Sequence, residues 1–181
     1  MDSQYAYAPA QVQPQKPALP GTLKAGAILV LLAGVAGVGS LLANLVGGKE
    51  LLREAVAGAL AREFGDSPAS LVEGPMMDFA LEEAQGVVTA RTSVLGFVGV
   101  LFLIFGSFIW ARMNWARITV IPFALIAFLM WLIDVVDDVP AIFRILDATG
   151  MLAMLVALVI VWLPPSNRAF RARKEERRAR R

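Results

Sequence analysis

Side chains that could do chemistry are few in this sequence of 181 residues. It contains no cysteine and no histidine, which removes disulfides, thiolate nucleophiles, imidazole bases and the usual soft metal ligands. It has no glycine-rich phosphate loop, and the Gly-Ser pairs at 39–40 and 106–107 lack a partner that would activate the serine. An enzyme acting on lipid would need a divalent ion, and the spacing of the Asp and Glu residues in the sequence does not specify a site for one. We therefore expect no enzyme, no cofactor and no metal site.

One acidic group stands out because it ends a long apolar run. Asp134 follows Trp131-Leu-Ile, and Asp137 and Asp138 come shortly after it. An ionisable residue in a membrane segment is a functional hypothesis by default, yet Asp134 is within a turn of the expected aqueous boundary. We expect an interfacial cap paired with Arg91 or Arg144. The alternative is a ring of the three aspartates at the mouth of a pore between subunits, where they would favour cations.

Four apolar runs predict that the chain crosses a membrane four times. They cover about 25–46, 92–110, 118–136 and 148–163, in a sequence that is 57% hydrophobic. A run of about 19 residues makes a helix of roughly 28 Å, close to the roughly 30 Å of a bilayer's hydrocarbon core. The expected fold is all-α, an integral membrane four-helix bundle with 23–166 as its one membrane domain.

The charges divide unevenly between the two sides of this membrane domain. Twelve of the 17 basic residues, but only three of the 15 acidic ones, lie in the two tails and the connector 111–117. The positive-inside rule then places both termini in the cytoplasm and the loop 47–91 outside a plasma membrane. Each basic residue near an anionic inner leaflet contributes about 1 kcal/mol. The residues expected at that lipid surface are Arg112, Arg117, Arg168, Arg171, Arg173 and Lys174. The basic tail 167–181 carries no motif that would read a nucleic acid.

Small side chains form matching stripes on the first two spans. The first span carries Ala33, Gly37, Ser40 and Asn44 at spacings of three and four, and the second carries Gly96, Gly99 and Gly106. Small residues let helices approach closely, which is a main source of association in lipid. We expect the two stripes to pack against each other inside one bundle; the alternative is that one of them makes a homo-oligomer.

The segments outside the spans have their own patterns. Residues 49–64 predict an amphipathic helix, and 76–92 predict a second helix that is either separate from the span 92–110 or continuous with it. Glycine and proline breaks separate the two segments, which together would form a small extracytoplasmic cap on the outer membrane face. The cap either packs on the bundle and headgroups or binds a ligand. The Pro/Gln-rich stretch 1–22 is too poor in large apolar residues to fold, so we expect a disordered cytoplasmic tail.

Two short motifs carry a resemblance. The W-A-R at 115–117 and the W-L-P-P-S-N-R-A-F at 162–170 resemble those of small, uncharacterised four-span membrane proteins of actinobacteria, which also begin with a Pro/Gln/Tyr-rich stretch. This chain has Leu163-Pro164 where Arg-Pro is frequent in that set. The resemblance implies a bacterial plasma-membrane protein and supplies no activity or site residue.

The function that we expect is that of a non-enzymatic accessory or scaffold subunit, in contact with the bilayer and with a membrane protein partner or further copies of itself. Its rival is a homo-oligomeric channel or transport component with an acidic outer mouth. The mid-span residues are almost all aliphatic, glycine or phenylalanine, whereas conduction paths usually carry polar groups near the midplane. A path through one monomer is therefore disfavoured.

Overall fold

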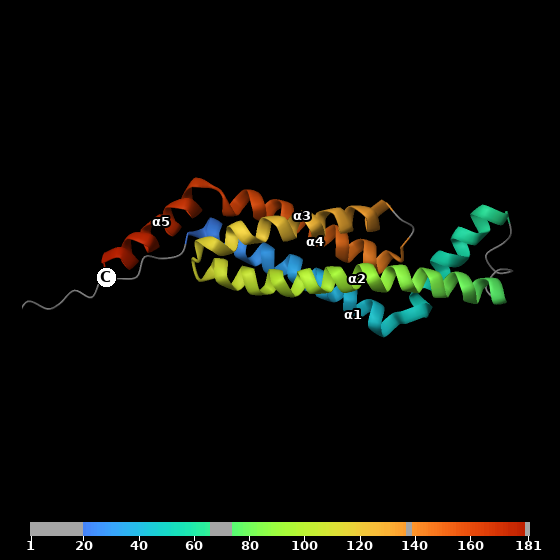
Figure 1. Cartoon of the computed structure of the whole chain (residues 1–181). Coiled ribbons are helices and arrows are strands. Elements are labelled where there is room, and N and C mark those ends of the chain that lie inside the picture. The colour runs from blue at the N-terminus through green and yellow to red at the C-terminus, as the bar shows by residue number, and fades with distance from the viewer. Residues whose placement is uncertain (1–19, 66–73, 137–138, 180–181) are drawn as a thin grey trace, which may run out of the picture.

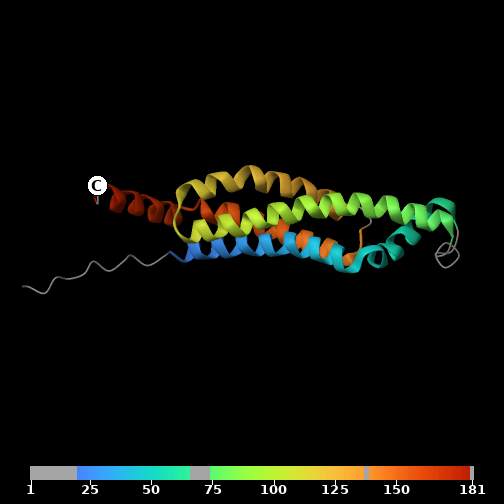
Figure 2. The same ribbon diagram turned by 60° about the horizontal axis from the view of Figure 1, so that its bottom comes forward.

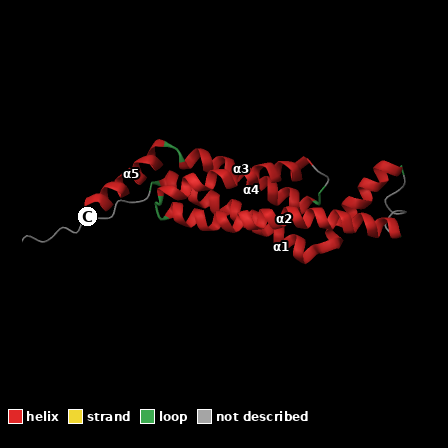
Figure 3. Ribbon diagram, in the orientation of Figure 1, coloured by secondary structure: helices red, strands yellow, loops and turns green. Residues whose placement is uncertain are grey.

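The computed structural model of the chain describes residues 20–65, 74–136 and 139–179, and all regular structure in these ranges is helical. Residues 1–19 of the predicted tail 1–22 and the predicted site residues Asp137 and Asp138 lie outside them, whereas helix already begins at Gly21 within that predicted tail. The helices are α1 (Gly21–Phe64), α2 (Pro75–Trp110), α3 (Asn114–Val136), α4 (Ala141–Val161) and α5 (Pro164–Ala179), as Figures 1 and 3 show. The all-α prediction is confirmed.

Helices α1 to α4 lie side by side with their axes nearly aligned (Figures 1 and 2). Each of the four contains a segment long and apolar enough to cross a membrane. The predicted four-helix membrane bundle is therefore confirmed. We call the end where α1 finishes and α2 begins the hairpin end, and the end where α1 begins and α5 lies the terminal end (Figure 1).

The first two helices are much longer than a bilayer requires. Helix α2 has 36 residues, about 54 Å at ~1.5 Å per residue, against roughly 30 Å of hydrocarbon. Helix α1 has 44 residues and bends at Gly48, whose φ of 47° and ψ of −136° suit a residue without a Cβ. The predicted spans 25–46 and 92–110 are thus the inner parts of two longer helices, and the amphipathic segments 49–64 and 76–92 continue them.

These outer halves form a helical hairpin that extends past the end of α3 (Figure 1). They share a small hydrophobic cluster made by Leu52, Ala57, Met77, Leu81, Val88 and Phe143. The predicted cap therefore exists as a helical hairpin with its own apolar contacts. It packs on itself and on the first turns of α4.

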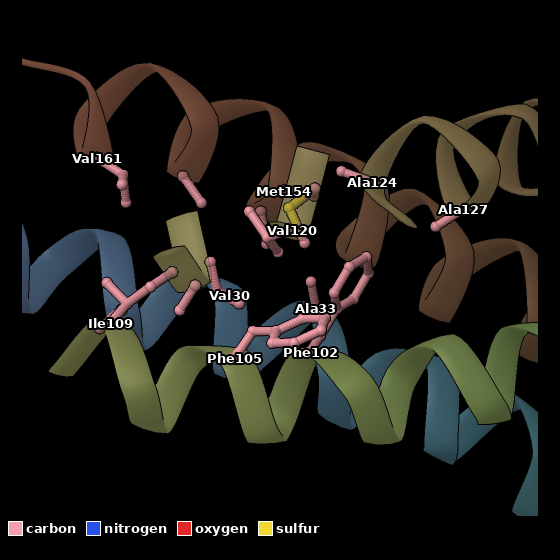
Figure 4. Packing of buried hydrophobic residues seen from close by; sticks show 14 of the residues in the cluster. Val30, Ala33, Phe102, Phe105, Ile109, Val120, Ala124, Ala127, Met154 and Val161 are labelled. Carbon is pink, nitrogen blue, oxygen red and sulfur yellow. The ribbon is translucent and has the colours of Figure 1, made fainter. Parts of the chain in front are cut away.

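The main core fills the space between the four spans (Figure 4). Phe102 and Phe105 of α2 project from one side, and Trp131 of α3, which is 1% exposed, closes the interior toward the hairpin end. Aliphatic side chains such as Leu125 and Val159 are exposed on the outside of the bundle, where a bilayer would cover them. The arrangement is that of a packed membrane bundle.

The end of the chain differs from the prediction. The fourth span was expected at 148–163, but α4 begins at Ala141, so 141–147 are its first turns. Pro164 and Pro165 open α5, because the first turn of a helix tolerates proline, whose missing N–H would be unpaired there. The basic tail is therefore helical through Ala179.

Candidate functional site

Polar side chains from all four spans meet toward the hairpin end of the bundle. We call this group the polar cluster; it consists of Ser40 and Asn44 of α1, Thr89 and Arg91 of α2, Asp134 of α3 and Asp147 of α4. Its most buried contact joins α1 to α4: the Ser40 hydroxyl donates a hydrogen bond of 2.8 Å to Oδ1 of Asp147. Ser40 is 0% and Asp147 1% exposed.

Two further contacts extend the polar cluster to α2 and α3. The Asn44 amide Nδ2 donates a hydrogen bond of 3.0 Å to the Thr89 hydroxyl. Arg91 forms an ion pair of 3.1 Å with Oδ1 of Asp134, whose side chain is almost completely buried. The polar cluster therefore links the four spans to one another.

The depth of Asp147 makes it the most unusual member. It lies six residues into α4, about 9 Å along the helix at ~1.5 Å per residue. Its Oδ2 has no hydrogen-bond partner among the described residues, although a buried polar atom normally has one. This carboxyl can take up a proton on Oδ2 while it keeps the Ser40 contact on Oδ1.

Sequence reasoning missed Asp147, although a signal was present. The buried residues of α4 step by four and three through Phe143, Asp147, Gly150, Met154 and Ala157, so Asp147 continues the apolar stripe toward the start of the helix. Because the fourth span was expected to begin at 148, Asp147 was left outside the helix in which this periodicity runs.

The residues predicted as a polar interface are only partly brought together. Asp134 pairs with Arg91, one of the two partners expected for it. Arg144 is exposed on the surface of α4. Because Asp134 is buried inside the bundle, it is not placed to ring a pore between subunits, and the channel hypothesis gains no support from this position.

The stripes of small residues face each other across α1 and α2. A Cβ added at Gly37 would lie 2.7 Å from the carbonyl oxygen of Leu95, and one at Gly99 would lie 2.8 Å from that of Gly34. Gly96 and Gly106 lie against the side chains of Leu41 and Leu31 of α1. These glycines are therefore used inside one chain, and an oligomer would need another surface.

The remaining stripe residues have two different surroundings. Ala33 is fully buried in the main core, whereas Ser40 and Asn44 belong to the polar cluster. One face of α1 thus changes from close packing to hydrogen bonding as it approaches the hairpin end.

At the terminal end Arg117 binds within the protein. Its guanidinium lies 4.4 Å from the ring centroid of Trp162 and 4.7 Å from that of Phe170, and it donates a hydrogen bond to Asn167. Stacking on aromatic faces is a property of arginine in particular. Arg117, which was predicted at the lipid surface, holds α5 against α3 and the end of α4 through these contacts.

The other basic residues predicted at the lipid surface are placed as follows. Arg168 and Arg171 are exposed on α5, and Arg112 is half-buried in the connector between α2 and α3. The side chains of Arg173 and Lys174 are outside the described part of α5. A second docking contact of α5 joins the Ser166 hydroxyl to Thr22 at 3.1 Å.

Within the described ranges, no three acidic side chains gather in a way that could hold a metal ion. Comparison with known proteins gives no guide to function, because no family model, no curated protein and no solved structure matches the chain.

Proposed function

We propose that this protein is a non-enzymatic accessory or scaffold subunit that binds another membrane protein through α2. The supporting observation is an exposed face that we call the outward face of α2. Its residues recur at helical spacing and are apolar except for one glutamate: Met76, Phe79, Glu83, Val87, Ala90, Val94, Phe97 and Ile104.

The outward face continues well beyond the bilayer. If Trp110 marks one membrane boundary, as interfacial tryptophans do, roughly 30 Å of hydrocarbon extends about 20 residues along α2, to Ala90. Phe79 then lies about 16 Å and Met76 about 21 Å outside at ~1.5 Å per residue. Phe79 is 70% and Met76 52% exposed. Lipid covers the inner part of this face and cannot cover the outer part.

Exposed apolar side chains outside the membrane mark a contact surface. Because this surface is continuous with the lipid-facing part of the same helix, the partner that fits it is a membrane protein with a span beside α2 and an apolar extramembrane segment. Phe102 and Trp131 pack against each other in the core of the bundle. A packed interior of this kind is expected of a scaffold rather than of a channel.

The orientation is part of the proposal. The terminal end faces the cytoplasm and the hairpin end faces outward across a plasma membrane, since the basic residues gather in the tails and the short connector. The resemblance of the 115–117 and 162–170 motifs points to a bacterial membrane.

The test is mild-detergent purification of the tagged full-length chain from its own host, followed by mass spectrometry and measurement of the particle mass. Phe79→Ser removes the most exposed apolar side chain of the outer part. Asp78→Ser is the control, because Asp78 is also exposed but points about 100° away around the helix. We expect a stoichiometric membrane protein partner that is lost with Phe79→Ser and kept with Asp78→Ser.

Other outcomes would decide against this function. A pure homo-oligomer that dissociates with Phe79→Ser would replace the foreign partner by a second copy. A monomer, or a partner indifferent to both substitutions, would show that the outward face of α2 is not the contact surface.

A further inference from the structure

The outward face of α2 is low at its centre and high on either side. Gly86 and Ala90, which we call the notch, lie one turn apart in the middle of this face, and both are exposed. Phe79 precedes Gly86 by seven residues and Phe97 follows Ala90 by seven, so each ring lies about 10 Å along the helix from the notch at ~1.5 Å per residue. The two rings are 70% and 63% exposed.

Packing within the described part of the chain does not require a glycine at position 86. A Cβ added at Gly86 would meet nothing within 4 Å, whereas one added at Gly96 or Gly106 of the same helix would lie 2.5 Å or 2.8 Å from a leucine side chain of α1. Glycine inside a helix is destabilising relative to alanine. Because small residues let a second helix approach closely, the notch suits a contact with another molecule.

The charge beside the notch indicates the chemistry of that molecule. Glu83 lies about 10 Å outside the bilayer if Ala90 marks the boundary, and its carboxylate has no hydrogen-bond or ion-pair partner among the described residues. A partner that covers the outward face would bury this carboxylate, which then needs an opposite charge. The segment 75–90 carries three acidic residues and no basic one. A second copy inserted in the same orientation would therefore bring like charges, so a basic foreign segment fits better.

The length of the outward face indicates the structure of the partner segment. The face runs from Phe97, inside the bilayer, to Phe79, outside it, on a helix that continues past the end of α3 (Figures 1 and 2). A segment that crosses the bilayer beside α2 is helical, because a helix pairs its backbone groups internally. The spacings of four and three from Phe79 through Glu83, Gly86 and Ala90 are those of helices that pack side by side at about 20°.

We propose that the notch receives a transmembrane helix of the partner, which packs closest to α2 at Gly86 and Ala90 and places a lysine or arginine against Glu83. This helix continues about three turns beyond the outer membrane boundary, to the level of Phe79. Phe79 and Phe97 pack on either side of the closest approach and fix the register of the two helices. The proposal rests on the proposed function, since it describes the segment with which that same partner binds.

The experiment measures how much of the co-purified partner stays bound to full-length variants when the complex is diluted in mild detergent. Gly86→Leu fills the notch. Gly58→Leu is the matched control, because a Cβ added at Gly58, on the outer half of α1, also meets nothing within 4 Å. We expect Gly86→Leu to weaken binding by about 5- to 150-fold, the range for overpacking a close contact. Gly86→Ala should weaken it less, and Gly58→Leu should bind as the wild type does, with unchanged circular dichroism for all three.

The charge is tested by Glu83→Lys, with Glu82→Lys as its control. Glu82 is also exposed but points about 100° away around the helix. We expect Glu83→Lys to weaken binding about tenfold or more, because it places like charges together, and Glu82→Lys to bind nearly as the wild type does. Equal effects of the two lysine substitutions would refute the basic contact.

The outcomes separate this inference from the proposed function. If Phe79→Ser releases the partner and Gly86→Leu does not, the outward face is the contact surface but no helix packs closely at the notch. A particle of two copies that Gly86→Leu dissociates would replace the foreign helix by a second copy of this chain. A wild-type monomer without any partner would overturn both proposals.

Discussion

Replacing Gly99 by alanine tests the close approach of α1 and α2 most directly. The added Cβ would lie 2.8 Å from the Gly34 carbonyl oxygen and 2.9 Å from the Val38 amide nitrogen. Both are backbone atoms of α1, so no rotamer change can relieve the contact. The two helices must separate or tilt.

The size of the effect follows from these distances. An ordinary contact of this kind begins near 3.4 Å, so the helices must part by roughly 0.6 Å at Gly99. A gap of ~0.5–1 Å forfeits about a quarter to a half of each pairwise attraction, and overpacking a close contact typically costs about 1–3 kcal/mol. At about 2 kcal/mol the ratio of folded to unfolded protein falls roughly thirtyfold.

The assay is reversible unfolding in mixed micelles of a mild detergent and dodecyl sulfate, followed by circular dichroism. Gly86→Ala on the same helix is the control: nothing lies within 4 Å of its added Cβ, so it should stabilise by about 0.5–1 kcal/mol through helix propensity alone. A loss of stability for Gly99→Ala together with a gain for Gly86→Ala would support the close contact between α1 and α2. If Gly99→Ala were as stable as Gly86→Ala, the close approach of α1 and α2 would be refuted.

Three further predictions concern the polar cluster, α5 and the orientation. Ser40→Ala should lower the free energy of unfolding by about 1–2 kcal/mol, since Asp147 loses its hydrogen-bond donor. Asp147→Asn keeps an acceptor for the Ser40 hydroxyl, so it should lower this free energy by less. Equal stability of Ser40→Ala and the wild type would contradict the hydrogen bond between Ser40 and Asp147. Arg117→Lys keeps the charge but loses the planar stacking, so amide hydrogen exchange in α5 should quicken, and unchanged protection would show that α5 is held otherwise. In this cysteine-free chain, an impermeant thiol reagent should label Glu63→Cys but not Glu175→Cys in intact cells; the reverse pattern would invert the orientation.

The fold was predictable because it depends on two strong patterns. Long apolar runs fix the number of helices in a membrane, since only helices and closed barrels satisfy the backbone there. The facing positions of Gly37 and Gly99 also follow from helical spacing, as small residues at one face indicate close packing. The ends of the helices were harder to predict. Helix α1 bends at Gly48 and continues to Phe64, because a local pattern of glycine and proline residues does not reveal at which of them a helix ends.

The Arg91–Asp134 ion pair was one of the two pairings expected for Asp134, but the other polar contacts could not be derived from the sequence, for a different reason. Asp147 looks like a residue of an outer loop until α4 is known to begin at Ala141, because its role depends on a serine 107 positions away. Arg117 looks like any basic residue beside a span. Its partners Trp162 and Phe170 come from later parts of the chain, and only the docking of α5 brings both rings to it.

The glycine contact and the polar cluster are parts of one arrangement, because the same face of α1 supplies both. Gly37 lies one turn from Ser40, and Asn44 is one turn further. The distance that Gly37 and Gly99 set between α1 and α2 also places Asn44 within 3.0 Å of Thr89. A separation of roughly 0.6 Å is enough to lengthen that bond past the range of a good hydrogen bond. The dependence of one contact on the other is therefore testable. Gly99→Ala should weaken the hydrogen bond between Asn44 and Thr89, whereas Ser40→Ala should leave the close approach of α1 and α2 at Gly37 and Gly99 unchanged.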